Sequence, residues 1–148
     1  MRGQHMAHSF QVTFDSKDPE THAAFWADAL GYGLQPPPPG YDSWEDWARA
    51  LAIPEKEWGD SAAISDPHGD GPRVYFQRVP EPKTAKNRMH LDINIADRSS
   101  SPEERRLQLD TEIERLVALG ATEVASYDDA KGVWTVMLDP EGNEFCVH

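Results

Sequence analysis

The stretch SFQVTFDSKDPETHAAFWADALG, residues 9–31, combines an alternating strand with a capped helix. Residues 9–14 alternate polar and apolar side chains, as half-buried strands do. Asp18 and Pro19 suit the N-cap and first turn of a helix, and Gly31 suits its left-handed C-cap. We therefore predict a strand followed by a helix. The apolar stripe of this helix consists of His22, Phe25, Trp26, Ala29 and Leu30.

The same plan recurs in the second half of the chain. Residues 90–95, HLDINI, form a second alternating segment, and residues 101–104, SPEE, are a capping box with proline in the first helical turn. Each half closes on strands joined by an Asp-Pro turn, at residues 66–69 and 139–142. Because the order of one strand, one helix and about three strands occurs twice, we predict two copies of one βαβββ module.

Domain boundaries follow from this repeat. We expect residues 8–80 to form the first module, residues 81–88 a linker and residues 89–148 the second module. Residues 1–7 are interpreted as a cloning remnant or a disordered N-terminus. The first module carries an additional segment, at about residues 35–60, that the second module lacks.

The additional segment is rich in proline and tryptophan. Pro36–Pro39 favours stiff, extended chain. Ser43 is a suitable N-cap for a short helix, which must end before Pro54. Trp44 and Trp47 lie on this helix. The segment either packs down as a satellite core or forms an aromatic lid over a pocket.

Composition excludes several classes of protein. The 148 residues include 26 acidic and 14 basic side chains, a net charge of −12, which argues against a nucleic-acid partner. The single cysteine, Cys146, excludes an internal disulfide. No apolar run reaches the ~20 residues of a membrane-spanning helix, and no signal-peptide pattern precedes the first strand. We expect a cytoplasmic protein without a membrane partner.

Alternation assigns the side chains of each strand to two faces. Apolar side chains, among them Phe10, Trp134 and Val136, are expected to face the helices. The opposite, polar faces would line a cleft if the two modules curl toward each other. The residues expected on these faces are Ser9, Gln11, Thr13, Tyr75, Gln77, His90, Asp92, Asn94, Thr135, Met137, Glu144, Cys146 and His148.

The chain resembles the vicinal oxygen chelate superfamily, which includes glyoxalase I, extradiol dioxygenases, fosfomycin-resistance enzymes and bleomycin-resistance proteins. The resemblance is strongest to its glyoxalase-like domain group. It rests on Asp18-Pro19 followed by Phe25-Trp26, on the strand that opens at His90, and on Asp139-Pro-Glu-Gly-Asn143. It implies an α+β fold in which two βαβββ modules, related by a pseudo-two-fold axis, form an open-sided barrel around one cleft.

In metal-dependent members of the superfamily, the first and last strands of each module supply the metal ligands. The resemblance places these ligands at Gln11, Gln77, His90 and Cys146, with Glu144 as a substitute two residues before Cys146. This set lacks the carboxylate that would help offset the charge of zinc, nickel, manganese or iron. One alternative is therefore a divalent metal at these positions, and the other is a cleft without a cofactor.

A ligand in the cleft would contact side chains from both modules. Arg88 belongs to a basic stretch that either is a solvated connection or attracts a carboxylate or phosphate group. The net negative charge would instead favour cationic or neutral aromatic compounds. The expected ligand contacts are Gln11, Thr13, Trp44, Trp47, Tyr75, Gln77, Arg88, His90, Met137 and Cys146.

Two functions fit this pattern best. The first is a small-molecule binding protein of the bleomycin-resistance kind, without a complete catalytic metal site. The alternative is a lyase or isomerase of the glyoxalase I kind, in which His90 is a base or metal ligand and Asp92 or Glu144 orients it. A protein–protein interaction module is a third hypothesis. The resemblance further implies a monomer or a homodimer, with modules paired within one chain or between two.

Overall fold

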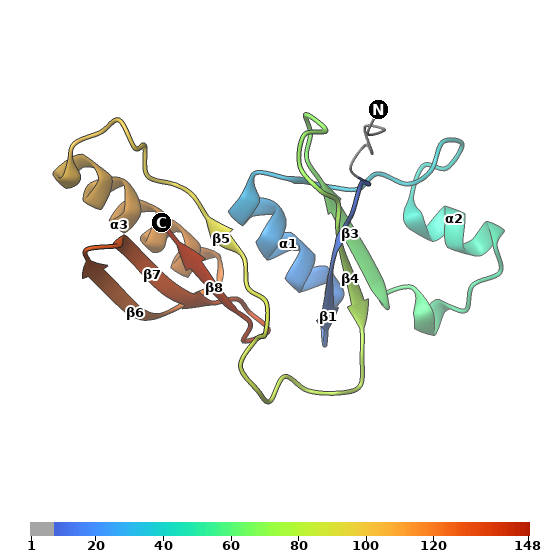
Figure 1. Ribbon diagram of the computed structural model, residues 1–148. Coiled ribbons are helices and arrows are strands. Elements are labelled where there is room, and N and C mark those ends of the chain that lie inside the picture. Colours follow the sequence, from blue (N-terminus) through green and yellow to red (C-terminus); the bar gives the residue numbers. More distant parts are fainter. Residues whose placement is uncertain (1–7) are drawn as a thin grey trace, which may run out of the picture.

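The computed structural model describes residues 8–148, and the interpretation of residues 1–7 lies outside the described residues. The strands are β1 (Val12–Ser16), β2 (Gly33–Leu34), β3 (Ser61–Ser65), β4 (Val74–Arg78), β5 (Asp92–Ile93), β6 (Thr122–Asp129), β7 (Gly132–Leu138) and β8 (Glu144–Val147). They form two four-stranded sheets, with the strand orders β1-β4-β3-β2 and β5-β8-β7-β6 (Figure 1).

Each sheet belongs to one half of the chain, so the predicted α+β fold with two modules is confirmed. In the first module β1 runs parallel to β4, with Phe14 opposite Phe76, and β4 is antiparallel to β3. In the second module β5 runs parallel to β8, with Asp92 opposite Cys146, and β8 is antiparallel to β7. The two ladders repeat one pattern, and neither sheet closes on itself.

Local sequence sets the ends of the long helices. The helices are α1 (Pro19–Leu30), α2 (Trp44–Ala50) and α3 (Pro102–Leu119), and a 3-10 turn spans Glu55–Glu57. Asp18 caps α1 with its side chain, and Ser101 forms a complete capping box on α3. Gly31 and Gly120 end these two helices with φ of 70° and 118°, where a side chain would be strained. None of the described helices combines the length and apolarity needed to cross a bilayer.

One hydrophobic core joins the two modules. On the first sheet, the ring of Phe14 stacks on Trp26 of α1, with centroids 5.5 Å apart. Trp26 also contacts Phe145 of β8, at 5.1 Å, and Leu109 and Leu116 of α3 belong to the same buried cluster. In Figure 1, α1 lies between the first sheet and the second module. Each large buried apolar side chain contributes about 1.5–3 kcal/mol. Since side chains of both modules belong to this one cluster, the packing of their helix-covered faces holds the modules together.

This packing leaves each sheet with an open face directed away from the shared core. Phe145 and Val147 point into the core, so Cys146 between them points to the other side of the second sheet. In the first sheet, Phe14 and Phe76 likewise point into the core, so their neighbours along each strand point to the other side. We define the first open face by Thr13, Asp15, Tyr75 and Gln77, and the second open face by His90, Asp92, Cys146 and His148.

The additional segment lies beside the first sheet, on the side remote from the second module (Figure 1). As predicted, Ser43 caps a short helix, α2. The rings of Trp44 and Trp47 meet edge-on, 5.4 Å apart, and the guanidinium of Arg49 lies 5.0 Å from the Trp58 ring centre. These contacts all lie within the additional segment.

Two predicted strand faces are wrong. Met137 and Thr135 face the core, opposite Phe145 and Val147, and Met137 is fully buried. The prediction failed because β7 has apolar side chains on both faces, so alternation alone could not tell which face is covered. Phe10 was expected in the core but is 73% exposed. The reason is that β1 begins only at Val12, and the residues before this strand lie outside the core.

Candidate functional site

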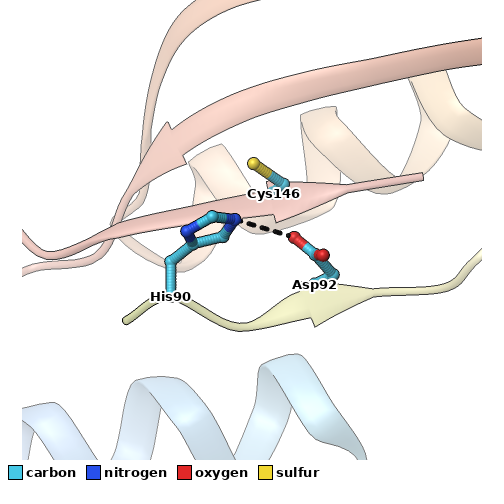
Figure 2. A group of neighbouring side chains, drawn as sticks. All are labelled: His90, Asp92 and Cys146. Atoms are coloured by element: carbon cyan, nitrogen blue, oxygen red, sulfur yellow. Dashed lines mark ion pairs between the residues drawn. The ribbon is translucent and has the colours of Figure 1, made fainter. Parts of the chain in front are cut away.

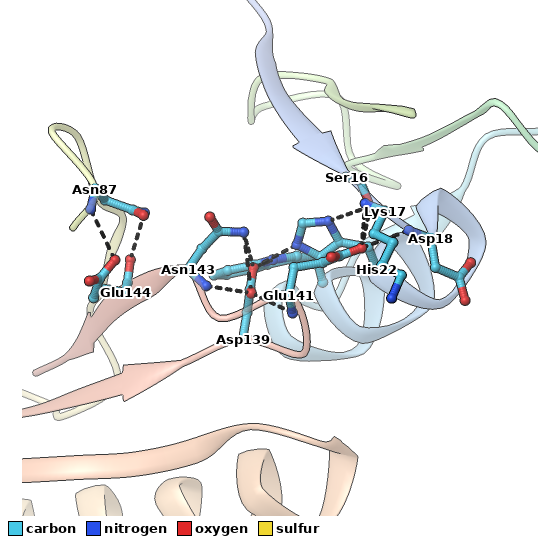
Figure 3. Close-up of polar contacts among 10 residues, drawn as sticks. Ser16, Lys17, Asp18, His22, Asn87, Asp139, Glu141, Asn143 and Glu144 are labelled. Carbon is cyan, nitrogen blue, oxygen red and sulfur yellow. Dashed lines mark hydrogen bonds and ion pairs between the residues drawn. The ribbon is translucent and has the colours of Figure 1, made fainter. Parts of the chain in front are cut away.

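A buried hydrogen-bond network joins the modules, and we call it the inter-module latch (Ser16, His22, Trp26, Asp139 and Glu141). Oδ2 of Asp139, in the turn before β8, lies 2.6 Å from Nε2 of His22 and 3.0 Å from Nε1 of Trp26, both on α1 (Figure 3). Burial opposes ionisation of Asp139, but hydrogen bonds from His22, Asn143 and Trp26 outweigh it and lower the pKa of Asp139.

Glu141 is the second anchor of the latch. Its Oε1 accepts hydrogen bonds from the Ser16 hydroxyl at 2.7 Å and from the backbone N–H groups of Lys17 and Asp18 at 2.8 and 2.7 Å. The carboxylate thereby caps the approach to α1 from the other module. Sequence reasoning assigned Glu141 only to a turn. A histidine in an otherwise apolar helical stripe was the signal that a buried polar partner was needed.

Ser16, His22 and Asp139 are connected in the order of a serine-hydrolase triad. Oγ of Ser16 lies 3.1 Å from Nδ1 of His22, and Nε2 of His22 contacts Asp139. The Ser16 hydroxyl, however, donates to Glu141, so its proton is not directed at His22. Ser16 is 2% exposed and His22 is 0% exposed. The three residues therefore connect the modules and are not arranged for nucleophilic attack.

A groove of about 770 Å³, here called the inter-module groove, lies between β1 and the second module. It is lined by both modules and by the linker between them. Its apolar lining includes Phe14, Trp26, Leu91 and Phe145. Its polar lining includes Thr13, Lys17, Lys83, Arg88, His90 and Glu144. The groove combines an apolar surface with several charged groups, which is the composition of a small-molecule site.

Glu144 is held by the linker. Its Oε2 accepts a hydrogen bond from the backbone N–H of Asn87 at 3.1 Å (Figure 3). The same oxygen pairs with Nζ of Lys83 at 3.2 Å. Burial opposes ionisation, yet the Asn87 N–H and the Lys83 ammonium lower the pKa of Glu144. Within residues 8–148, Glu144 does not belong to the group of metal-ligand atoms that surrounds His90.

The second open face gathers three potential ligands. Nε2 of His90 lies 3.2 Å from Oδ1 of Asp92, and one ligand atom each of His90, Asp92 and Cys146 lies within 4.8 Å of the others (Figure 2). Burial, followed by the nearby Asp92 carboxylate, raises the pKa of the Cys146 thiol. As predicted, alternation brings these three side chains to one face.

Three further residues beside this cluster were missed as site residues. His148 was expected on the polar face but not as a ligand, and its Nε2 lies 3.5 Å from the same Oδ1 of Asp92. Its ring stacks at 6.5 Å on Trp134, which stacks at 5.2 Å on Tyr127. The wrong face assigned to β7 concealed Trp134. The aromatic pair opposite one another on β6 and β7 was the available signal.

Of the four metal positions implied by the superfamily, His90 lines the inter-module groove, and Gln11, Gln77 and Cys146 are not part of its lining. The side-chain oxygen of Gln11 accepts a hydrogen bond from Arg73 at 2.9 Å, and Gln77 donates to Asp15 at 3.0 Å. Both glutamines belong to the first sheet's open side, whereas His90 and Cys146 belong to the second. Since the glutamines are paired and neutral, these four residues do not fit a divalent metal within one protomer.

The remaining predicted residues occupy separate places. Thr13 and Arg88 line the inter-module groove. Tyr75 lies on the first open face, 5.3 Å below the Arg73 guanidinium. Trp44 and Trp47 lie in the additional segment and are not part of the groove's lining. The structure therefore brings His90, Arg88, Thr13 and Glu144 to one groove and leaves the other predicted contacts outside it.

Solved structures with the same fold support this architecture. A glyoxalase/bleomycin resistance protein/dioxygenase family enzyme from Burkholderia phytofirmans aligns over 93% of this chain and 94% of its own, with 16% identity and a TM-score of 0.61. A variant of the fosfomycin resistance protein FosX from Listeria monocytogenes, in complex with Mn(II) and 1S,2S-dihydroxypropylphosphonic acid, aligns over 97% and 90%, with 14% identity and a TM-score of 0.62. At these identities the likeness defines the fold alone.

The family is defined at the level of sequence. Residues 11–148 match the glyoxalase-like domain family. The chain belongs to this family, a member of the vicinal oxygen chelate superfamily. No curated protein sequence matches the chain closely enough to assign a more specific activity.

Proposed function

We propose that the protein binds a small organic molecule in the inter-module groove, without a complete catalytic metal centre, as bleomycin-resistance proteins do. The observation that carries this proposal is a groove to which both modules contribute walls. Its volume of about 770 Å³ falls within the roughly 300–1,000 Å³ of small-molecule pockets.

The lining favours an organic acid. Phe14 and Leu91, which are half-buried, and the exposed Met89 offer an apolar surface to the body of the molecule. Lys83 is paired with Glu144, but the ion pairs found among residues 8–148 involve neither Lys17 nor Arg88. These two cations suit a carboxylate or a phosphate-like group. The protein's net negative charge is screened beyond about 8–10 Å. The cations beside the groove therefore determine which ligand charge it prefers.

Ligand titration monitored by tryptophan fluorescence tests this proposal. The probes are aromatic carboxylates, phosphonates and cationic aromatic antibiotics. We expect an organic acid to give a saturable change, because Trp26 lines the groove. Arg88→Ala should weaken that acid about tenfold or more, since hydrogen bonds to charged groups contribute about 1.5–3 kcal/mol. Arg98→Ala removes an exposed arginine outside the groove and should leave binding unchanged.

Two outcomes would contradict the proposal. One is a folded protein that binds none of the probes. The other is an organic acid whose affinity falls equally in the Arg88 and Arg98 variants, which would place it outside the groove. The protein could instead prefer a cationic antibiotic, with an affinity that Arg88→Ala leaves unchanged or increases. That result would retain the groove as the binding site but replace the organic acid by a cationic ligand.

One observation favours an enzyme as the second candidate. His90 lines the groove and its Nε2 lies 3.2 Å from the Asp92 carboxylate, which can orient an imidazole that moves a proton. A lyase or isomerase using His90 as base would lose turnover in His90→Ala while retaining ligand binding. Unchanged turnover in that variant would remove His90 as the base.

A further inference from the structure

We propose that Glu144 is an internal competitor for the acid group of a groove ligand, and that its carboxylate holds the linker, residues 81–88, against the second module. The inference rests on the proposed function, because it concerns the same inter-module groove. Glu144 lines that groove together with Lys83, Asn87 and Arg88 of the linker. The carboxylate that restrains the linker therefore lies where the ligand would bind.

The linker is attached to the rest of the protein through this one residue. It runs from β4 to β5 without forming a helix or strand (Figure 1). Within residues 8–148, each hydrogen bond or ion pair that joins residues 81–88 to another segment ends on Glu144. Apart from the half-buried Asn87, the linker residues are exposed. Little packing therefore holds the linker once the contacts of Glu144 are removed.

Three contacts form this attachment. The backbone N–H of Asn87 donates to Oε2 of Glu144 at 3.1 Å, and the side-chain amide of Asn87 donates to the backbone carbonyl of Glu144 at 3.3 Å (Figure 3). Nζ of Lys83 lies 3.2 Å from the same Oε2. The side chains of Lys83 and Glu144 are only 27% and 20% exposed, so water weakens this ion pair less than one on the surface.

The partners of Glu144 are those that the carboxylate of a ligand needs. A backbone N–H and an ammonium converge on one carboxylate oxygen. The strength of such charge-assisted hydrogen bonds depends on charge and geometry, and not on which molecule carries the carboxylate. An acid in the groove must therefore displace Glu144 from Lys83 or bind beside its negative charge. Either event lowers the affinity for acids, whereas a neutral molecule is unaffected.

Limited proteolysis with trypsin tests the restraint without any ligand. The linker has three cleavage positions, after Lys83, Lys86 and Arg88, and the masses of the first fragments identify cuts there. Glu144→Gln preserves the size of the side chain but removes its charge. We expect the linker to be cut about tenfold faster, because hydrogen bonds to charged groups are the stronger ones and cleavage follows the population of the open form. Glu114→Gln, an exposed glutamate of α3 outside the groove, should be cut at the wild-type rate.

Calorimetric titration with benzoate and its neutral counterpart benzamide tests the competition. Glu144→Gln should bind benzoate about tenfold more tightly than the wild type does, since the Lys83 ammonium becomes free to pair with the ligand. The affinity for benzamide should be the same in both proteins. In the double variant Lys83→Ala/Glu144→Gln the gain for benzoate should disappear, because the ammonium that Glu144 released is absent.

Several results would overturn the inference. Linker cleavage at the wild-type rate in Glu144→Gln would mean that Glu144 does not restrain the linker. If the wild type binds benzoate and Glu144→Gln binds it no more tightly, Glu144 does not compete, and the groove proposal stands. If neither protein binds benzoate or any other groove probe, both proposals are wrong. Should Glu144→Gln lose its circular dichroism, Lys83→Gln breaks the same ion pair from the linker side, and its cleavage after Lys86 and Arg88 decides.

Discussion

Replacing Asp139 by alanine tests whether the inter-module latch holds the two modules together. The side chain is buried and accepts hydrogen bonds from the side chains of His22 and Trp26 and from the backbone N–H groups of Glu141 and Asn143. Alanine leaves these donors buried without their acceptor. Each buried donor left without its acceptor costs about 1–3 kcal/mol, so the loss of several is a large part of the 5–15 kcal/mol that stabilises a domain.

Urea unfolding measured by tryptophan fluorescence gives this free energy. The matched control is Asp66→Ala, in the corresponding Asp-Pro turn of the first module. Asp66 accepts only backbone N–H groups, from His68, Asp70 and Gly71, and its loss should cost about 1–2 kcal/mol. A loss below about 1 kcal/mol for Asp139→Ala, or equal losses in both variants, would refute the role of the latch.

The pH dependence of stability in a charge-removing variant, Asp139→Asn, provides an independent test. The folded-state pKa of Asp139 is lowered from its ordinary 3.8, so its ionised form is stabilised by folding. That contribution is complete well above pH 3.8 and is lost as the pH falls through the lower folded-state value. The stability difference between wild type and Asp139→Asn should therefore shrink as the pH falls from about 5 through 3.8 and below. A constant difference would show that the charge contributes nothing.

Two further predictions concern core packing and helix capping. Met137→Ala should lower the free energy of unfolding in urea by about 2–5 kcal/mol, because Met137 is fully buried. Trp134→Ala, on the open side of the sheet, should lower it less. The opposite order would mean that Trp134, and not Met137, faces the core. Ser101→Ala should cost about 0.5–2 kcal/mol by removing the capping box of α3, and Ser99→Ala in the preceding loop serves as its control.

Much of this fold follows from local sequence. Asp18 and Gly31 delimit α1, and Ser101 and Gly120 delimit α3, because capping depends only on residues within one helical turn. The repeated order of strand and helix predicted two modules. Strand alternation likewise predicted that His90, Asp92 and Cys146 share one face, since a parallel ladder in the family register sets them side by side.

Tertiary packing decided what alternation left open. The two faces of β7 are both apolar, and only the position of α3 determines that Met137 is covered and Trp134 is not. An apolar helical stripe likewise does not reveal its partner. His22 and Asp139 are 117 residues apart in the chain, and they meet because the modules pack through α1. Sequence periodicity reports which side chains share a face, but burial and long-range pairing depend on how separate elements fill space together, which no local pattern encodes.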